Sequence, residues 1–122
     1  MTSDKPIVVL ISKNIVFLPR IEAAAGSSLR VRRLTETDMA DPLVRENELV
    51  AIIVDLEEDK SIWKPVLKEL NHCLLESSIS VQLVAYGPHE DKDSMDEARA
   101  MGCDPVLSKG AFVNQIRSIL HP

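Results

Sequence analysis

The side chains in this chain that could do chemistry follow short apolar runs. Asp55 ends a long apolar run that starts at Leu49. Ser12 and Lys13 follow the first apolar run of the chain, and Lys109 follows the last one. If these runs are neighbouring parallel strands, one carboxylate faces two ammonium groups, which can balance its charge through short ionic hydrogen bonds.

A second group of residues, Gly87, Pro88 and His89, follows the apolar run that ends at Tyr86. The His89 imidazole titrates near neutral pH, so it could overhang the same place and bind an anion or act as an acid–base group. It could instead be the exposed end of a Gly-Pro turn before the acidic segment 90–93, which is the interpretation we favour.

Short apolar runs alternate along the chain with segments of helical period. The predicted strands are 7–11, 29–34, 49–56, 80–86 and 105–108, and the predicted helices are 14–25, 41–47, 61–76, 93–101 and 111–120. Pro19 disfavours a helical conformation before it, so the first helix is expected to start near that residue. The polar alternation of 29–34 predicts an edge strand, whereas the unbroken apolar run 49–56 predicts a central one. Asp41 is expected to cap the second helix.

This strict alternation predicts an α/β fold: a doubly wound, five-stranded parallel sheet with helices on both faces. The flavodoxin-like strand order 2-1-3-4-5 has its crevice at the carboxyl ends of the first and third strands. We expect a single domain over residues 1–122, with a core from about 7 to 120. The residues that follow the strands, namely Ser12, Lys13, Asp55, Gly87, His89 and Lys109, would lie at the edge of this crevice.

Composition excludes several other classes of protein. The net charge is −5 and aromatic residues make up 3% of the 122 residues, which disfavours nucleic-acid binding. No apolar run approaches the ~20 residues of a membrane span, and the N-terminus lacks the pattern of a secretory signal. We therefore expect a cytoplasmic protein in which Cys73 and Cys103 are free thiols. No nucleophile–base signature or metal-binding cluster is present in the sequence, so an enzyme is not expected.

The arrangement resembles the receiver domain of bacterial response regulators, the CheY-like superfamily, over nearly the whole chain. Asp55 matches the aspartate that accepts a phosphoryl group in that family, and Lys109 matches the lysine that pairs with it. The spacing from Gly102 to Lys109 also fits the family. The resemblance thus implies the fold, two site positions and a role in two-component signal transduction or a phosphorelay.

The departures from the family pattern fall on the same site. The two acids that bind magnesium in the family are replaced here by Ser12 and Lys13. The family's Ser or Thr at the end of the fourth strand is Gly87, unless a shift puts Tyr86 there. The aromatic residue usual in the fifth strand is Val106. The chain therefore resembles a degenerate receiver, or pseudo-receiver.

These departures bear directly on magnesium. Phosphoryl transfer relies on a divalent cation, and magnesium needs several oxygen ligands. Glu57 and Glu58 are expected to point to solvent, which leaves Asp55 as the one clear ligand, so we expect no magnesium and no other cofactor. We hypothesise that Lys13 and Lys109 satisfy Asp55 and lower its pKa. In the alternative, Asp55 caps the loop after its strand and Lys13 points outward.

The leading functional hypothesis is a stand-alone pseudo-receiver that acts through protein–protein contacts without magnesium-dependent phosphotransfer. The partner would be a histidine kinase, another signalling protein or a second copy of the chain. The resemblance points to the face of the fourth helix, fifth strand and fifth helix, with Met95, Arg99, Asn114 and Arg117 as contact residues. Two alternatives stay open: an unconventional receiver phosphorylated on Asp55, and a small-ligand or anion sensor or enzyme that uses the crevice.

Overall fold

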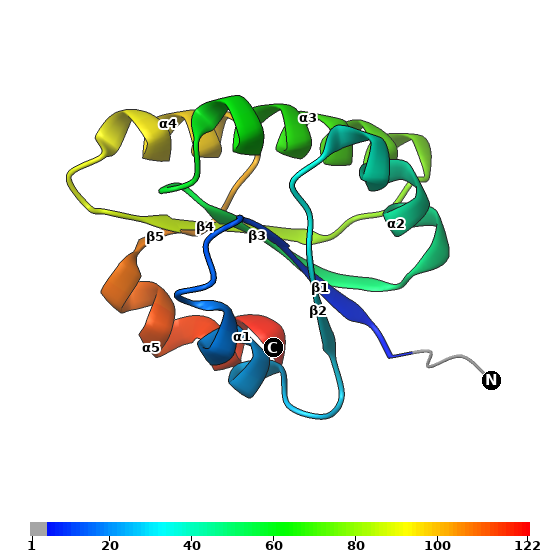
Figure 1. Ribbon diagram of the computed structural model, residues 1–122, viewed down its shortest axis with the longest axis horizontal. Coiled ribbons are helices and arrows are strands. Elements are labelled where there is room, and N and C mark those ends of the chain that lie inside the picture. The colour runs from blue at the N-terminus through cyan, green and yellow to red at the C-terminus, as the bar shows by residue number, and fades with distance from the viewer. Residues whose placement is uncertain (1–4) are drawn as a thin grey trace.

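A five-stranded parallel sheet forms the centre of the computed structural model, which describes residues 5–122 (Figure 1). The strands are β1 (Ile7–Ile11), β2 (Arg30–Arg33), β3 (Leu49–Asp55), β4 (Gln82–Gly87) and β5 (Val106–Ser108). The helices are α1 (Leu18–Ala25), α2 (Ala40–Glu46), α3 (Lys60–Glu76), α4 (Lys92–Ala100) and α5 (Lys109–Leu120), with a 3₁₀ turn at Thr37–Met39.

The strand order is β2-β1-β3-β4-β5 and every pairing is parallel, which confirms the predicted fold class. β2 is an edge strand with partly exposed residues, whereas β1 is buried along its whole length. α1 and α5 lie side by side on one face of the sheet, and α2, α3 and α4 cover the other (Figure 1). The carboxyl ends of β1, β3 and β4 therefore meet at one edge, as expected for a right-handed doubly wound sheet.

Alternate residues of the central strands fill two apolar cores, one on each face of the sheet. Ile52 and Val54 of β3 point into the core under α2 and α3, which also holds the fully buried Trp63. Ala51 and Ile53 point to the α1–α5 side, where the aromatic side chains of Tyr86 and Phe112 are stacked. Asp55 follows the same alternation, so its side chain lies on the α1–α5 side.

Helix boundaries differ from the sequence-based expectations in two places that matter. α5 starts at Lys109 instead of Ala111, because the Ser108 hydroxyl caps the helix by accepting from the Ala111 N–H at 3.2 Å. The prediction that Asp41 caps α2 is wrong. The helix begins one residue earlier, and Asp41 instead pairs with Arg45 one turn on, at 3.0 Å.

Both cysteines are buried and free, 2% exposed each. Burial raises the pKa of the Cys103 thiol to about 12 and also raises the pKa of Cys73. Because the thiolate is the reactive form, a thiol reagent such as Ellman's reagent at pH 8 should modify neither cysteine in the native protein. After denaturation both should react; fast native-state modification of Cys103 would contradict this burial.

Within residues 5–122, the helices are too short or too polar for any of them to cross a bilayer.

Candidate functional site

Asp55 is a buried carboxylate at the carboxyl edge of the sheet, with 1% of its surface exposed. Its Oδ2 accepts a hydrogen bond from the Ser12 hydroxyl at 2.8 Å, and its Oδ1 accepts from the Glu57 backbone N–H at 2.9 Å. Ser12 itself is fully buried at the end of β1. Each carboxylate oxygen therefore has a partner from the protein, and solvent reaches neither freely.

The environment of Asp55 favours its neutral form. Burial raises the pKa of the Asp55 carboxyl, and the nearby charges of Glu57 and Glu58 raise it further. The hydrogen bonds from Ser12 and from the Glu57 N–H act in the opposite direction but do not offset the burial. The expectation of a lowered pKa is therefore wrong.

The lysines expected to pair with Asp55 lie elsewhere. Lys109 Nζ pairs with Glu57 Oε1 at 2.7 Å. The Lys13 backbone N–H donates to Glu58 Oε1 at 2.5 Å, and the Lys13 side chain is exposed. The hypothesis that Lys13 and Lys109 satisfy Asp55 is thus contradicted. The structure supports the alternative, in which Asp55 caps the loop after β3 and Lys13 points outward.

The same contacts correct the expectation that Glu57 and Glu58 only point to solvent. Their carboxylates tie the loop after β3 to α5 and to the end of β1. Glu57 thus pairs with the Lys109 ammonium group, whereas Glu58 accepts from a backbone N–H of Lys13. The sequence signal for this arrangement is the position of Glu57, two residues after Asp55, which ends its strand.

An aromatic cluster, which the sequence analysis missed, forms one wall beside Asp55. Tyr86 is paired with Asp55 across β3 and β4, stacks on Phe112 at a centroid distance of 4.3 Å, and contacts Phe17 edge-on at 5.1 Å. Burial first, and then the negative charge of Asp55 and hydrogen bonding to it, raise the pKa of the Tyr86 phenol. The phenol therefore stays protonated beside the acid.

Gly87 stands where the resemblance expects a hydroxyl side chain, and the structure explains its absence. A Cβ built on Gly87 would lie 2.8 Å from the Cβ of Leu56, a separation that side chains do not tolerate. Leu56 is 3% exposed and belongs to the core under α3. A serine or threonine therefore cannot occupy this position while Leu56 keeps its place.

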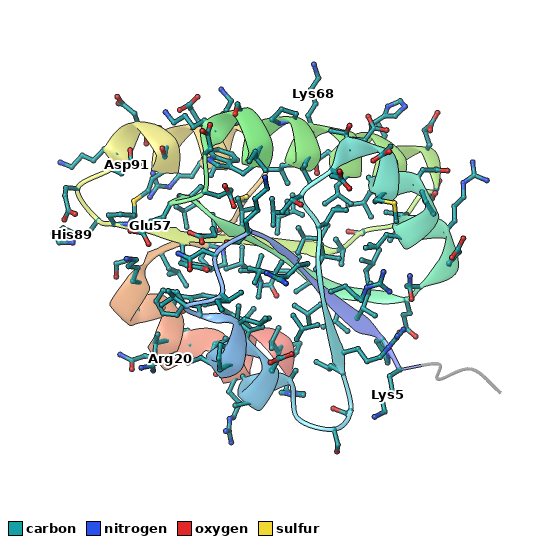
Figure 2. The ribbon with its side chains drawn as sticks, viewed as in Figure 1. Lys5, Arg20, Glu57, Lys68, His89 and Asp91 are labelled. Carbon is teal, nitrogen blue, oxygen red and sulfur yellow. The ribbon has the colours of Figure 1, made fainter. Side chains whose placement is uncertain are left out.

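A shallow hollow of about 360 Å³ lies over this edge of the sheet, but Asp55 does not line it. Its lining includes Glu57, Ser108 and Lys109 on one side and the loop that carries His89 on the other. Figure 2 shows Glu57 and His89 at the end of the sheet where β4 leads into α4. The His89 side chain is 84% exposed and pairs with Glu90 at 3.2 Å, as in the Gly-Pro turn interpretation.

The residues at this edge do not fit the magnesium site that the fold implies. Both oxygens of Asp55 already accept hydrogen bonds, and the two acidic positions are a buried serine and a lysine. No three His, Cys, Asp or Glu side chains in the described part of the chain are grouped to hold a metal ion. Hard cations need several oxygen ligands, whereas here Asp55 is buried and neither Ser12 nor Lys13 supplies a carboxylate.

The face suggested for partner binding needs one correction. Met95 is 8% exposed and packs into the core under α3 and α4, so its side chain is not a contact surface. Arg99 is exposed and pairs with Asp96 at 3.0 Å. Asn114 and Arg117 are exposed on α5 and stay candidates.

The chain has the CheY-like fold of response-regulator receiver domains. One similar structure is the receiver domain of Saccharomyces cerevisiae Ssk1, solved with the histidine phosphotransfer protein Ypd1. It has a TM-score of 0.69 and 15% identity, over 99% of this chain and 92% of that one. Another is a putative response regulator from Chloroflexus aurantiacus, with a TM-score of 0.68 and 17% identity, over 97% and 100% of the two chains.

A third is the Mn²⁺-bound response regulator Rcp1, with a TM-score of 0.66 and 13% identity, over 93% of this chain and 91% of that one. No protein-family model and no curated protein sequence matches the chain. The likeness thus concerns the fold, and the site has to be judged from its own residues.

Proposed function

We propose that the protein is a pseudo-receiver: a non-enzymatic signalling module that works through protein contacts, with Asp55 as a structural group instead of a phospho-acceptor. The burial of Asp55, with both oxygens bonded, is the observation that carries this proposal. The alternative of an unconventional acceptor at Asp55 requires that these contacts open first.

The chemistry of phosphoryl transfer argues in the same direction. The attacking oxygen must reach the phosphorus in line with the leaving group, and positive charge must balance the transferred oxygens. Here the carboxylate is covered, its pKa is raised, and Lys109 is engaged with Glu57. A receiver-like domain with these contacts at the edge of its sheet would keep the fold but would not accept a phosphoryl group.

The partner is proposed to be another signalling protein of a cytoplasmic two-component system. The Ssk1 receiver domain, which shares this fold, was solved with a histidine phosphotransfer protein. We extend that class of partner to this chain, together with histidine kinases. A second copy of the chain is the other candidate.

Incubation with acetyl phosphate and Mg²⁺ tests the proposal. We expect the intact mass to stay unchanged, because the carboxylate is not open to the donor. The Rcp1 receiver under identical conditions checks the donor and the detection of a labile acyl phosphate. A mass increase of one phosphoryl group that disappears in Asp55→Asn would overturn the proposal. A thermal shift with inorganic phosphate that is lost in His89→Ala would favour an anion sensor instead.

A further inference from the structure

The outer edge of β2 is open. In the part of the chain that the structure describes, β2 pairs with β1 and with no other strand. The N–H groups of Arg30 and Leu34 donate to carbonyls on the β1 side at 3.0 and 2.9 Å. Because main-chain groups alternate in direction along a strand, those of Val31 and Arg33 face away from β1. Such an edge can pair with an added strand.

The two faces of β2 differ in their chemistry. Val31 packs against the core on the α1–α5 side, whereas Leu34, just past the strand, belongs to the core under α2 and α3. Because side chains alternate between the two faces, Arg30 and Arg32 lie on the same face as Leu34. An added strand would therefore meet apolar groups on one face and guanidinium groups on the other.

The Arg30 guanidinium is incompletely bonded. Its Nη2 donates to Asn47 Oδ1 at 3.2 Å, but its Nε is buried and has no hydrogen-bond partner among the described residues. A buried donor without a partner is unfavourable, and a carboxylate on an added strand could accept from this guanidinium. Arg32, on the same face, is exposed.

A hollow of about 340 Å³ lies where the loop after α1 enters β2, at the bottom of the molecule in Figure 1. Ala25, Leu29 and Val31 give it an apolar lining, and Glu22 of α1 also lines it. An apolar side chain from an added strand would fit this hollow, whereas a carboxylate there would be repelled by Glu22. The hollow thus selects apolar residues on one face of the added strand.

Recognition at this edge would depend on local pairing and not on net charge, since acids also occur in the neighbouring segments. Glu22 lies on α1, Glu36 follows β2, and Glu48 precedes β3. Within residues 5–122, none of these acids forms an ion pair with an arginine of β2. The guanidinium groups of β2 are therefore available to carboxylates from outside, which arginine can bind through two hydrogen bonds.

We propose that the open edge of β2 binds an extended segment of a partner protein in which apolar and acidic residues alternate. The main chain of this segment pairs with Val31 and Arg33, its apolar side chains enter the hollow, and its carboxylates face Arg30 and Arg32. The inference goes beyond the function proposed above and does not depend on the state of Asp55.

A second copy of the chain is a poor occupant of this edge. Two β2 strands side by side would place arginines opposite arginines, and like charges directly opposite each other are destabilising. Charged residues on an edge strand thus disfavour self-association while they leave the edge complementary to an acidic strand.

Amide hydrogen exchange in the presence of short synthetic peptides tests the edge. One peptide alternates valine and glutamate, and a matched peptide has the same residues in two blocks. With the alternating peptide, exchange of the Val31 and Arg33 amides should slow at least tenfold, because these amides gain a hydrogen-bond partner. The Arg32 amide faces β1 and should not change. The block peptide should bind at least tenfold more weakly, since it cannot present one kind of side chain to each face.

Backbone methylation of the alternating peptide separates strand addition from simple charge attraction. N-methyl groups on the valines block one edge of the peptide, and N-methyl groups on the glutamates block the other. One methylated peptide should lose binding and the other should keep it, because a single edge of the peptide pairs with β2. Loss with methylated valines would indicate an antiparallel added strand, and loss with methylated glutamates a parallel one.

Two protein variants with the same charge change test the arginine face. Arg32→Glu should weaken binding of the alternating peptide at least tenfold, since it places a carboxylate opposite the glutamates of the peptide. Lys92→Glu is the control, because Lys92 is exposed on α4, which packs on β4 and β5 at the other end of the sheet. This control should leave binding unchanged.

Four results would overturn the proposed role of the β2 edge. These are equal binding of the alternating and block peptides, unchanged exchange of the Val31 and Arg33 amides at millimolar peptide, equal binding of the two methylated peptides, or self-association that protects the same two amides. The last result would make a second copy the occupant. Phosphorylation of Asp55 by acetyl phosphate, with peptide binding at β2 intact, would instead overturn the proposed function and leave this inference standing.

Discussion

Gly87→Thr is expected to lower the free energy of unfolding by about 2–3 kcal/mol, even though threonine is a usual residue at this position of the receivers that the chain resembles. The new Cβ would meet the Leu56 Cβ at 2.8 Å, and neither atom is the free end of a flexible side chain. The end of β4 and the segment that follows β3 would have to separate to make room. Urea unfolding monitored by the fluorescence of Trp63, which is fully buried, measures the effect.

Two matched variants sharpen that experiment. Gly110→Ala adds a methyl group at a helical position with no atom within 4 Å, so stability should stay the same or rise by up to about 1 kcal/mol. In a Leu56→Gly background, which removes the clashing Cβ, Gly87→Thr should cost less than it does alone, because the two sites share one volume. Wild-type stability of Gly87→Thr, or strict additivity with Leu56→Gly, would show that the close approach does not exist in solution.

Asp55→Asn is expected to raise the free energy of unfolding at pH 7 by about 1 kcal/mol, because it removes a charge that burial penalises. The amide keeps both contacts: its oxygen can accept from the Glu57 N–H, and its NH₂ can donate to the Ser12 hydroxyl, which accepts as well as donates. Thermal unfolding of the two proteins, measured side by side, gives the difference.

The effect should depend on pH in a defined direction. The folded-state pKa of Asp55 is raised above its unfolded value, so its contribution to stability is fully present below the unfolded pKa. That contribution is lost as the pH rises through the folded-state pKa. Wild type and Asp55→Asn should therefore converge in acid and diverge toward neutral pH.

Asp59, in the same loop, has a pKa that is shifted in the opposite direction from that of Asp55. It caps α3 by accepting from the Ser61 N–H at 2.8 Å, and hydrogen bonds from Ser61 lower its pKa. Its stabilising contribution is present above the unfolded pKa and is lost as the pH falls through the folded-state pKa. Asp59→Ala should thus destabilise the protein at neutral pH. If Asp55→Asn and Asp59→Ala changed the free energy of unfolding at neutral pH in the same direction, the environments assigned to the two carboxylates would be wrong.

The sequence was sufficient for the fold because the apolar pattern is strong where the sheet is most buried. The unbroken apolar run at Leu49 to Val54 is typical of a central strand, and the arginines at 30, 32 and 33 favour an edge strand. The predicted strand order was that of the flavodoxin-like arrangement, and the right-handed connections placed helices on both faces of the sheet. The start of α1 near Pro19 followed from local stereochemistry.

The position of the site could be predicted from the sequence, but the ion pairs between its side chains could not. The strand ends put Asp55 and Lys109 at one edge, yet which acid a lysine contacts depends on side-chain rotamers and on where α5 begins. The helix starts at Lys109, and its ammonium group pairs with Glu57. Met95 was placed on the partner face by the resemblance alone, whereas the helical period of α4 puts it on the inward side with Ala98, as the structure has it.

The sequence also does not show why a side chain is excluded at position 87. This exclusion depends on a close approach between β4 and the residue after β3, which a strand pattern does not encode. The aromatic wall was hidden in the same way. Its three members come from the loop before α1, from β4 and from α5, and only packing brings them together.

A carbon-13 titration of the Asp55 side-chain carboxyl group is the most direct measurement of the site. We predict a midpoint above the ordinary value for aspartate and a chemical shift that millimolar Mg²⁺ leaves unchanged, because the group is covered and both its oxygens are bonded. A midpoint at or below the ordinary value, or a Mg²⁺-dependent shift of this resonance, would show an open, metal-binding acid and contradict the structural role assigned to it.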